Sequence, residues 1–147
     1  MACVRGCDFP EDRHYHPRYN VWLKSEGPGL ATLGATSYGV ALAVEFLAFV
    51  PKRDGTEVDA DRAVGLLELA KTMISVRTPI AATIIASNEA VVKRPETINQ
   101  DPYGSGWLVR LRVASELEEA PGLLSGAEIA PAFEEAMRLD DFDGARP

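Results

Sequence analysis

Lys71 is the residue whose position first suggests chemistry. It stands in Glu68-Leu69-Ala70-Lys71-Thr72-Met73, between two short strand-like runs with little turn punctuation around it. A lysine at the tip of a tight hairpin presents its amine to solvent, where a modifying enzyme can acylate it. The alternative is an ordinary surface lysine, which is the usual state of this residue type. The spacing of other residues relative to Lys71 along the chain distinguishes these two interpretations.

The other candidate groups lie near the N-terminus, where Cys3 and Cys7 precede His14 and His16. Cys7 is a candidate redox thiol, able to exchange with a disulfide-bearing arm if Arg5 lowered the pKa of the thiol. The other interpretation is a packed or solvent-facing thiol. The spacing Cys-x3-Cys-x6-His-x-His differs from the common structural zinc patterns, so we predict no metal site and place the histidines at the surface.

Short apolar runs separated by Gly and Pro turns must position these groups. Many short strands at near-regular spacing predict a mainly β fold of the sandwich or barrel type. We expect a short helix capped by Thr36-Ser37, and we expect Trp22 and Trp107 in the core. The predicted strands span 20–24, 30–33, 46–50, 64–70, 73–78, 79–87 and 107–113.

The C-terminal part has a different pattern. Pro121-Gly122 breaks the chain, and apolar residues then recur at every fourth position, which predicts an amphipathic helix at about 126–139. Ser125 with Glu128 three residues later is typical of a capping box. The apolar positions of the helix are Ile129, Phe133 and Met137.

Charge divides the chain in the same place. The net charge is −7, and because residues 114–147 hold nine acids and two arginines (2 − 9 = −7), all of it lies in this acidic extension. The body is neutral, with 13 acidic and 13 basic side chains, and lacks the basic face that nucleic-acid binding requires. We therefore expect an accessory segment whose removal leaves the body intact.

Several function classes are excluded by the remaining patterns. The longest apolar run, residues 38–50, contains Glu45 and is too short to cross a bilayer, so we expect no membrane association. The N-terminus has no apolar segment of the signal-peptide type, which predicts a cytoplasmic protein. The sequence shows no Ser-His-Asp arrangement, and we expect a protein that is not an enzyme.

The spacing around Lys71 resembles the H protein of the glycine cleavage system, a lipoyl carrier, over about residues 21–113. The resemblance implies a hybrid barrel-sandwich of antiparallel strands with short peripheral helices. The matching positions are Gly55, Glu68, Pro79 and Asn88, and the segment Asp101-Pro102-Tyr103-Gly104-Ser105-Gly106-Trp107-Leu108.

The same resemblance implies that lipoate is joined to Lys71 by an amide and that Glu68 helps the lipoate-attaching enzyme to recognise the hairpin. A biotin carrier is disfavoured, because such carriers have Met-Lys-Met where this chain has Ala70 and Thr72 as flanks. The carrier domain would span 19–113, between an arm at 1–18 and the acidic extension at 114–147.

The N-terminal segment, residues 1–18, indicates one branch of the family. Asn20-Val21-Trp22 replaces the usual His-Glu-Trp, and Ala82 replaces a glycine that is normal after the hairpin's proline. The segment 5–12, with Tyr15, is similar to the lipoate-binding proteins of the bacterial sulfur-oxidising, heterodisulfide-reductase-like pathway. This similarity implies that the lipoyl dithiol carries a sulfur intermediate between enzymes.

Two alternatives stay open. One is the H protein role itself, in which the lipoyl arm on Lys71 carries an aminomethyl group. The other is an H-like binding module without lipoate. The partners that the resemblance implies are a lipoate-attaching enzyme, dihydrolipoamide dehydrogenase, and either a heterodisulfide-reductase-like complex or the glycine cleavage enzymes.

Overall fold

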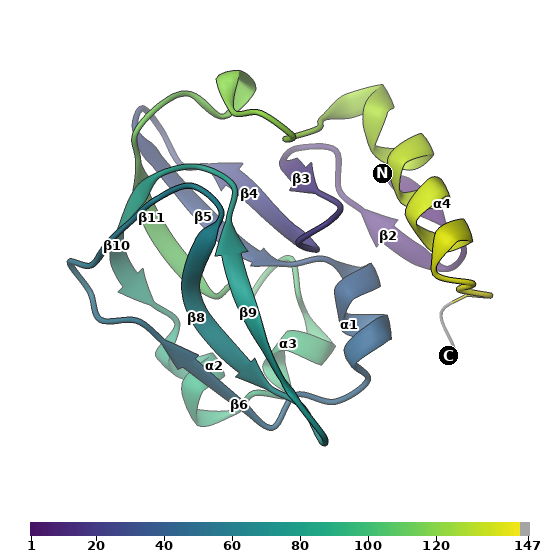
Figure 1. The fold of residues 1–147 in the computed structure, drawn as a ribbon, viewed down its shortest axis with the longest axis horizontal. Coiled ribbons are helices and arrows are strands. Elements are labelled where there is room, and N and C mark those ends of the chain that lie inside the picture. Colours follow the sequence, from purple (N-terminus) through teal and green to yellow (C-terminus); the bar gives the residue numbers. More distant parts are fainter. Residues whose placement is uncertain (145–147) are drawn as a thin grey trace.

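The structure, a computed structural model, describes residues 1–144 and consists of three antiparallel sheets with short helices between the strands (Figure 1). The end of the predicted extension, including Arg146, lies outside the described residues. The strands are β1 (Ala2–Val4), β2 (Cys7–Phe9), β3 (His14–His16), β4 (Val21–Ser25), β5 (Leu30–Ala35), β6 (Ala48–Pro51), β7 (Glu57–Val58), β8 (Arg62–Glu68), β9 (Met73–Thr78), β10 (Ala82–Ser87) and β11 (Val109–Val113). The helices are α1 (Ser37–Ala43), α2 (Glu89–Lys93), α3 (Thr97–Gln100) and α4 (Ile129–Leu139), with 3-10 turns at Leu117–Glu119 and Gly126–Glu128.

Two of the sheets share the first hydrophobic core. The larger has the strand order β3-β4-β5-β11-β10-β7, and the smaller has the order β6-β8-β9. Strands β8 and β9 bury one face against the larger sheet, as their alternation of buried and exposed residues requires. This architecture confirms the predicted mainly β fold of barrel-sandwich type with short helices. The buried residues of the smaller sheet are Phe49, Val64, Leu67 and Val76.

A glycine allows β6 to lie close to β8. The ladder between β8 and β9 is irregular between Ala63 and Gly65, where β8 bulges. A Cβ atom on Gly65 would lie 2.9 Å from the carbonyl oxygen of Val50 and 3.0 Å from the Phe49 ring. The absence of a side chain at Gly65 therefore lets the two strands pair.

A second core joins the two ends of the chain. The segment expected to be an aperiodic arm contains three strands, because Cys7, Phe9 and Tyr15 alternate with exposed or half-buried residues. Helix α4 lies against β1 and β2 (Figure 1), and the rings of Phe9 and Phe133 stack with centroids 4.1 Å apart. The buried members of this second core are Val4, Cys7, Phe9, Tyr15, Trp22, Tyr38, Ile129, Phe133 and Met137.

Polar contacts reinforce the same junction. The guanidinium of Arg5 donates to Glu134 Oε1 at 2.8 Å and to the carbonyl oxygen of Phe142 at 2.7 Å. The hydroxyl of Tyr38 donates to the carboxylate of Asp140. Acids of the extension thus hold it to the N-terminal strands and to α1. Helix α4 is therefore part of the packed structure, and the division of the chain into a carrier domain and an accessory segment stays a prediction.

Arg13 connects the N-terminal strands to the loop before β11. Its guanidinium is buried between two rings, 4.6 Å from the centroid of Trp22 and 5.3 Å from that of Tyr103. Its charge is balanced by Asp12 at 2.8 Å, and this contact lowers the pKa of the Asp12 carboxyl. Gly34 opposite Trp22 leaves room for the indole, which a side chain there would strike.

Two smaller predictions need correction. The side chains of Ser125 and Glu128 form no cap, because a 3-10 turn precedes α4. The helix itself is confirmed, with Ile129, Phe133 and Met137 fully buried on one face. Trp22 is in a core as expected, whereas Trp107 is half-buried beneath the guanidinium of Arg110, which lies 4.3 Å from its ring.

We expect Phe133→Ala to lower the free energy of unfolding by about 3–4 kcal/mol, because it leaves a cavity beneath three aromatic rings. Guanidinium unfolding followed by circular dichroism measures the change. Glu128→Gln, an exposed change one turn away, is the control and should alter stability by less than about 0.5 kcal/mol. Equal stability of the Phe133 variant and the parent would contradict a second core.

Candidate functional site

Lys71 lies at the tip of the hairpin formed by β8 and β9. The strands end at Glu68 and resume at Met73, and the amide of Leu69 donates to the carbonyl oxygen of Thr72 at 2.8 Å, which closes the turn. The Lys71 side chain is exposed and forms no ion pair with any residue between 1 and 144. An amine placed in this way can be acylated without disturbing any contact of the fold.

The smaller sheet holds the base of this tip from one side. Glu68 lies between Ala48 on β6 and Met73 on β9, and its carbonyl oxygen accepts the amide of Leu47 at 2.8 Å. The carboxylate of Glu68 is exposed, three residues before Lys71. The structure therefore places both predicted residues on one accessible end of the hairpin, with a fixed backbone beneath them.

Exposed apolar side chains surround the tip, and together they form the apolar rim. Val44, the residue after α1, has φ 69° and ψ −59°, in a tight turn closed by the amide of Glu45 on the carbonyl oxygen of Ala43. This conformation is rare for a β-branched residue and turns the side chain into solvent. The members of the rim are Leu42, Val44, Leu47, Met73 and Ile74, with exposed fractions between 40% and 75%.

A groove of about 340 Å³ runs along β9 from the tip; we call it the lateral groove. Apolar side chains line the part near the tip, and polar ones line the far part. Sequence analysis singled out neither Arg18 nor Arg77 of the far part, although alternation along β9 puts Arg77 on the same side as Ser75. The residues near the tip are Leu42, Ala43, Leu69 and Ile74, and those of the far part are Arg18, Tyr19, Asn20, Ser75 and Arg77.

Cys7 lies in the second core and not at the hairpin. It is 1% exposed, and burial raises the pKa of its thiol, which is the opposite of the shift that a reactive thiol needs. Cys3 is exposed on the other face of the β1–β2 ribbon. The environment of Cys7 is therefore that of a packed thiol, the second of the two interpretations given above.

The histidines are half-buried in β3, where we expected surface side chains. The ring of His16 stacks on Tyr19 with centroids 4.0 Å apart, and burial lowers the pKa of this histidine. His14 lies 3.9 Å from a carboxylate oxygen of Glu118. Within residues 1–144, no three side chains of the His, Cys, Asp and Glu types converge in a way that would hold a metal ion.

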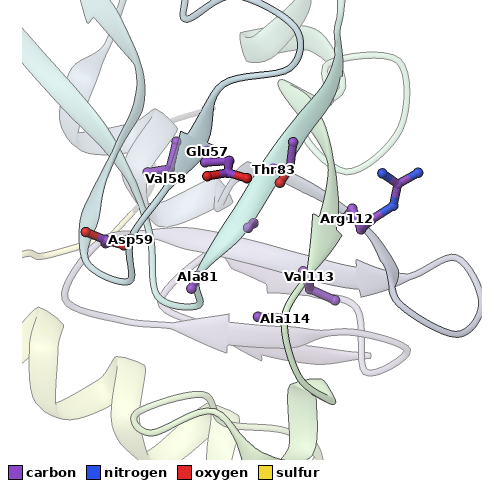
Figure 2. A pocket seen from close by; sticks show the side chains of 9 residues that line it. Glu57, Val58, Asp59, Ala81, Thr83, Arg112, Val113 and Ala114 are labelled. Atoms are coloured by element: carbon purple, nitrogen blue, oxygen red, sulfur yellow. The ribbon is translucent and has the colours of Figure 1, made fainter.

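A second groove, of about 360 Å³, lies beside β7, β10 and β11 (Figure 2). Figure 2 shows the guanidinium of Arg112 directed away from Glu57 and Asp59, so these charges form no cluster. None of the predicted site residues lines this groove. No helix among the described residues is long and apolar enough to cross a membrane.

Known proteins are similar to this chain over most of its length. A family model described as "Glycine cleavage H-protein" matches residues 13–136, which extends the resemblance beyond 21–113 and into α4. A protein named "Glycine cleavage system H protein 5" from Aquifex aeolicus is 39% identical over 134 residues, covering 88% of this chain and 89% of that protein. A "Probable glycine cleavage system H protein 2" from Sulfurisphaera tokodaii is 35% identical and covers 95% of each chain.

A solved structure supports the same relationship. The crystal structure of a glycine cleavage system H protein from Mycobacterium marinum superposes with a TM-score of 0.72 at 28% identity. The match covers 82% of this chain and 94% of that protein. The fold of this chain is thus shared with a solved relative.

We expect the two thiols to differ in reactivity, because one is exposed and the other is packed between strands and α1. In the native protein, Ellman's reagent should react rapidly with Cys3 alone, and guanidinium should release Cys7. Cys3→Ser is the control and should leave almost no fast phase. A rapid reaction of Cys7 in the folded protein would show that the second core opens readily.

Proposed function

The chain belongs to the glycine cleavage H-protein family, and from that premise we propose that lipoate is attached to Lys71. Members of this family carry lipoate covalently on a lysine and serve as substrates for partner enzymes without being enzymes themselves. The observation that carries the proposal is the exposed amine at the tip of a braced hairpin, free of ion pairs in the part of the chain that the structure describes.

The residues around the tip have separable tasks in this proposal. The Lys71 amine forms the amide, and the loss of its charge leaves the exposed Glu68 as the acidic group three residues away. Glu68 offers the lipoate-attaching enzyme an exposed carboxylate at a fixed distance along the chain. The apolar rim offers successive partners a surface of the kind that transient docking uses. When bound, lipoate supplies a cyclic disulfide that opens to a dithiol and closes again.

The group carried on the arm has two candidates. The comparisons favour the aminomethyl group, because each named relative is a glycine cleavage H protein. The partners would then be the glycine cleavage enzymes and dihydrolipoamide dehydrogenase. The sulfur cargo, with a heterodisulfide-reductase-like partner, rests on the N-terminal segment. Packing in the second core accounts for Cys7, Phe9 and Tyr15 of that segment.

We expect protein made in its native host to carry one lipoyl group, and Lys71→Arg to carry none, because arginine keeps the charge but cannot form the amide. Intact-mass spectrometry measures the difference. We expect Glu68→Gln to slow lipoylation about three- to tenfold without abolishing it, since it removes a charge at the edge of the enzyme contact.

Lys93→Arg, an exposed lysine at the end of α2, is the matched control and should be lipoylated like the parent. Persistent absence of the lipoyl group from the parent, or its presence on Lys71→Arg, would contradict the proposal. A tight partner complex that is indifferent to Lys71→Arg would indicate a binding module without lipoate.

The carried group is tested with glycine decarboxylase. We expect lipoylated protein to support exchange of labelled bicarbonate into the glycine carboxyl group, and Lys71→Arg to support none. The exchange is followed by radioactivity retained in glycine. A fully lipoylated protein that gives no exchange would remove the aminomethyl role and favour the sulfur cargo.

A further inference from the structure

Val44 is unfavourable to the fold in two ways. Of the five non-glycine residues with positive φ among residues 1–144, it alone is apolar and β-branched. Its side chain is 75% exposed, and in the same part of the chain only Met1 is a more exposed large apolar residue. Val44 belongs to neither hydrophobic core. Neither backbone preference nor packing therefore accounts for a valine at this position.

The conformation of Val44 is nevertheless held by several hydrogen bonds. The amide of Val44 donates to the carbonyl oxygen of Val40 at 3.0 Å, and the amide of Glu45 donates to that of Ala43 at 2.8 Å. From α3, the side-chain amide of Asn99 donates to the carbonyl oxygen of Val44 at 2.8 Å. Rare backbone conformations persist where neighbours hold them, and they gather at binding and catalytic sites. Because a β-branched side chain also has few rotamers, its direction is fixed before any partner binds.

Val44 lies beside the base of the hairpin. The residue before it, Ala43, lines the lateral groove together with residues on both sides of the β8–β9 turn. Three residues after Val44, the amide of Leu47 donates to the carbonyl oxygen of Glu68, which is itself three residues before Lys71. The segment that carries Val44 therefore contacts the hairpin both before and after this residue.

We infer that Val44 is a recognition residue for the lipoate-attaching enzyme and that Asn99 is the residue that positions it. The enzyme receives the isopropyl group of Val44 in an apolar pocket while its active site takes the amine of Lys71. The inference rests on the proposed lipoylation of Lys71 and adds a second contact to that of Glu68. A side chain whose direction is already fixed loses little freedom on binding, which strengthens the complex.

The length of the lysine side chain indicates which partner contacts Val44. The amine of an unmodified lysine lies about 6 Å from its Cα atom by standard bond lengths. The attaching enzyme must therefore bring its active site to the tip itself, and its surface covers the residues beside the hairpin. Lipoyl-lysine extends on the order of 12–14 Å, so an enzyme that acts on the end of the arm can dock farther away. Contact with Val44 is thus required for attachment and dispensable afterwards.

The experiment measures lipoylation of the unmodified protein by a lipoate-attaching enzyme supplied with lipoate and ATP. ATP converts the lipoate carboxyl group to an acyl adenylate with release of pyrophosphate, and the Lys71 amine then displaces AMP and loses a proton as the amide forms. Intact mass at increasing protein concentration gives kcat and KM. We expect Val44→Gly to raise KM about tenfold with kcat within about twofold of the parent, because the reacting amine stays in place.

Stability gives an independent readout of the same variant. Glycine adopts positive φ without strain, so Val44→Gly should keep the Tm of the parent or raise it by up to about 3 °C. A fall of more than about 3 °C would show that Val44 serves the fold and would overturn the inference.

An isosteric change isolates the apolar character of the side chain. Val44→Thr keeps the shape and the backbone demand of valine but places a hydroxyl group in the apolar pocket, so it should raise KM about threefold. Val92→Thr, the same change at an exposed valine of α2 in a different groove, is the matched control and should leave KM unchanged.

Asn99→Ala tests the positioning residue. It frees the carbonyl oxygen of Val44, and we expect KM to rise about threefold in the parent background but not in Val44→Gly, where no side chain is left to position. A purely structural role of Asn99 would give the same change in both backgrounds, and that result would refute its positioning role.

The choice of partner is tested after lipoylation. Fully lipoylated Val44→Gly should support the glycine exchange with a KM within about twofold of the parent, because the long arm relaxes the docking distance. A tenfold rise there would overturn the assignment to the attaching enzyme. Equal KM of parent and Val44→Gly in lipoylation itself would overturn the inference while leaving Lys71 as the attachment point, whereas a parent that is never lipoylated contradicts the proposed function.

Discussion

The burial of one face of the β8–β9 hairpin against the larger sheet is the contact on which the candidate site depends. Val64, Leu67 and Val76 are at most 4% exposed, and burying each contributes about 1.5–3 kcal/mol. That total is comparable to the roughly 1–2 kcal/mol per residue lost when the four loop residues are ordered. The packed face fixes the base of the hairpin, and the opposite end remains free to present Lys71.

The two cores divide the molecule's tasks. The first core holds the hairpin, and the second joins the N-terminal strands to α4 at some distance from it (Figure 1). The residues of the first core support the hairpin that presents Lys71, the proposed attachment point of the lipoyl arm. Support of the hairpin and the junction between the two ends of the chain therefore rest on different residues.

The sequence predicts those features that depend on local pattern. The short apolar runs at 64–70 and 73–78 predict the two strands of the hairpin, and the spacing of Phe133 and its neighbours predicts α4. Strands β1 and β2 have three residues each, and β7 has two, so their signal is too short to stand out from loop composition. The contact of Arg13 with Tyr103 and the convergence of Arg18 with Arg77 join residues far apart in the chain, and no local period records such contacts.

The fixed backbone beneath the tip also determines the effective concentration of the group at the end of the lipoyl arm. With the turn closed by Leu69 and Thr72, the attachment point is a stationary pivot, and an arm of about 14 Å sweeps a volume in which one terminal group is present at on the order of 0.1 M. A partner site that would hold the free terminal group with a dissociation constant of about 50 mM is then occupied most of the time while the partner is docked. Contacts too weak to retain a free ligand are thus sufficient for a tethered one, and passing the group from one partner to the next requires little energy.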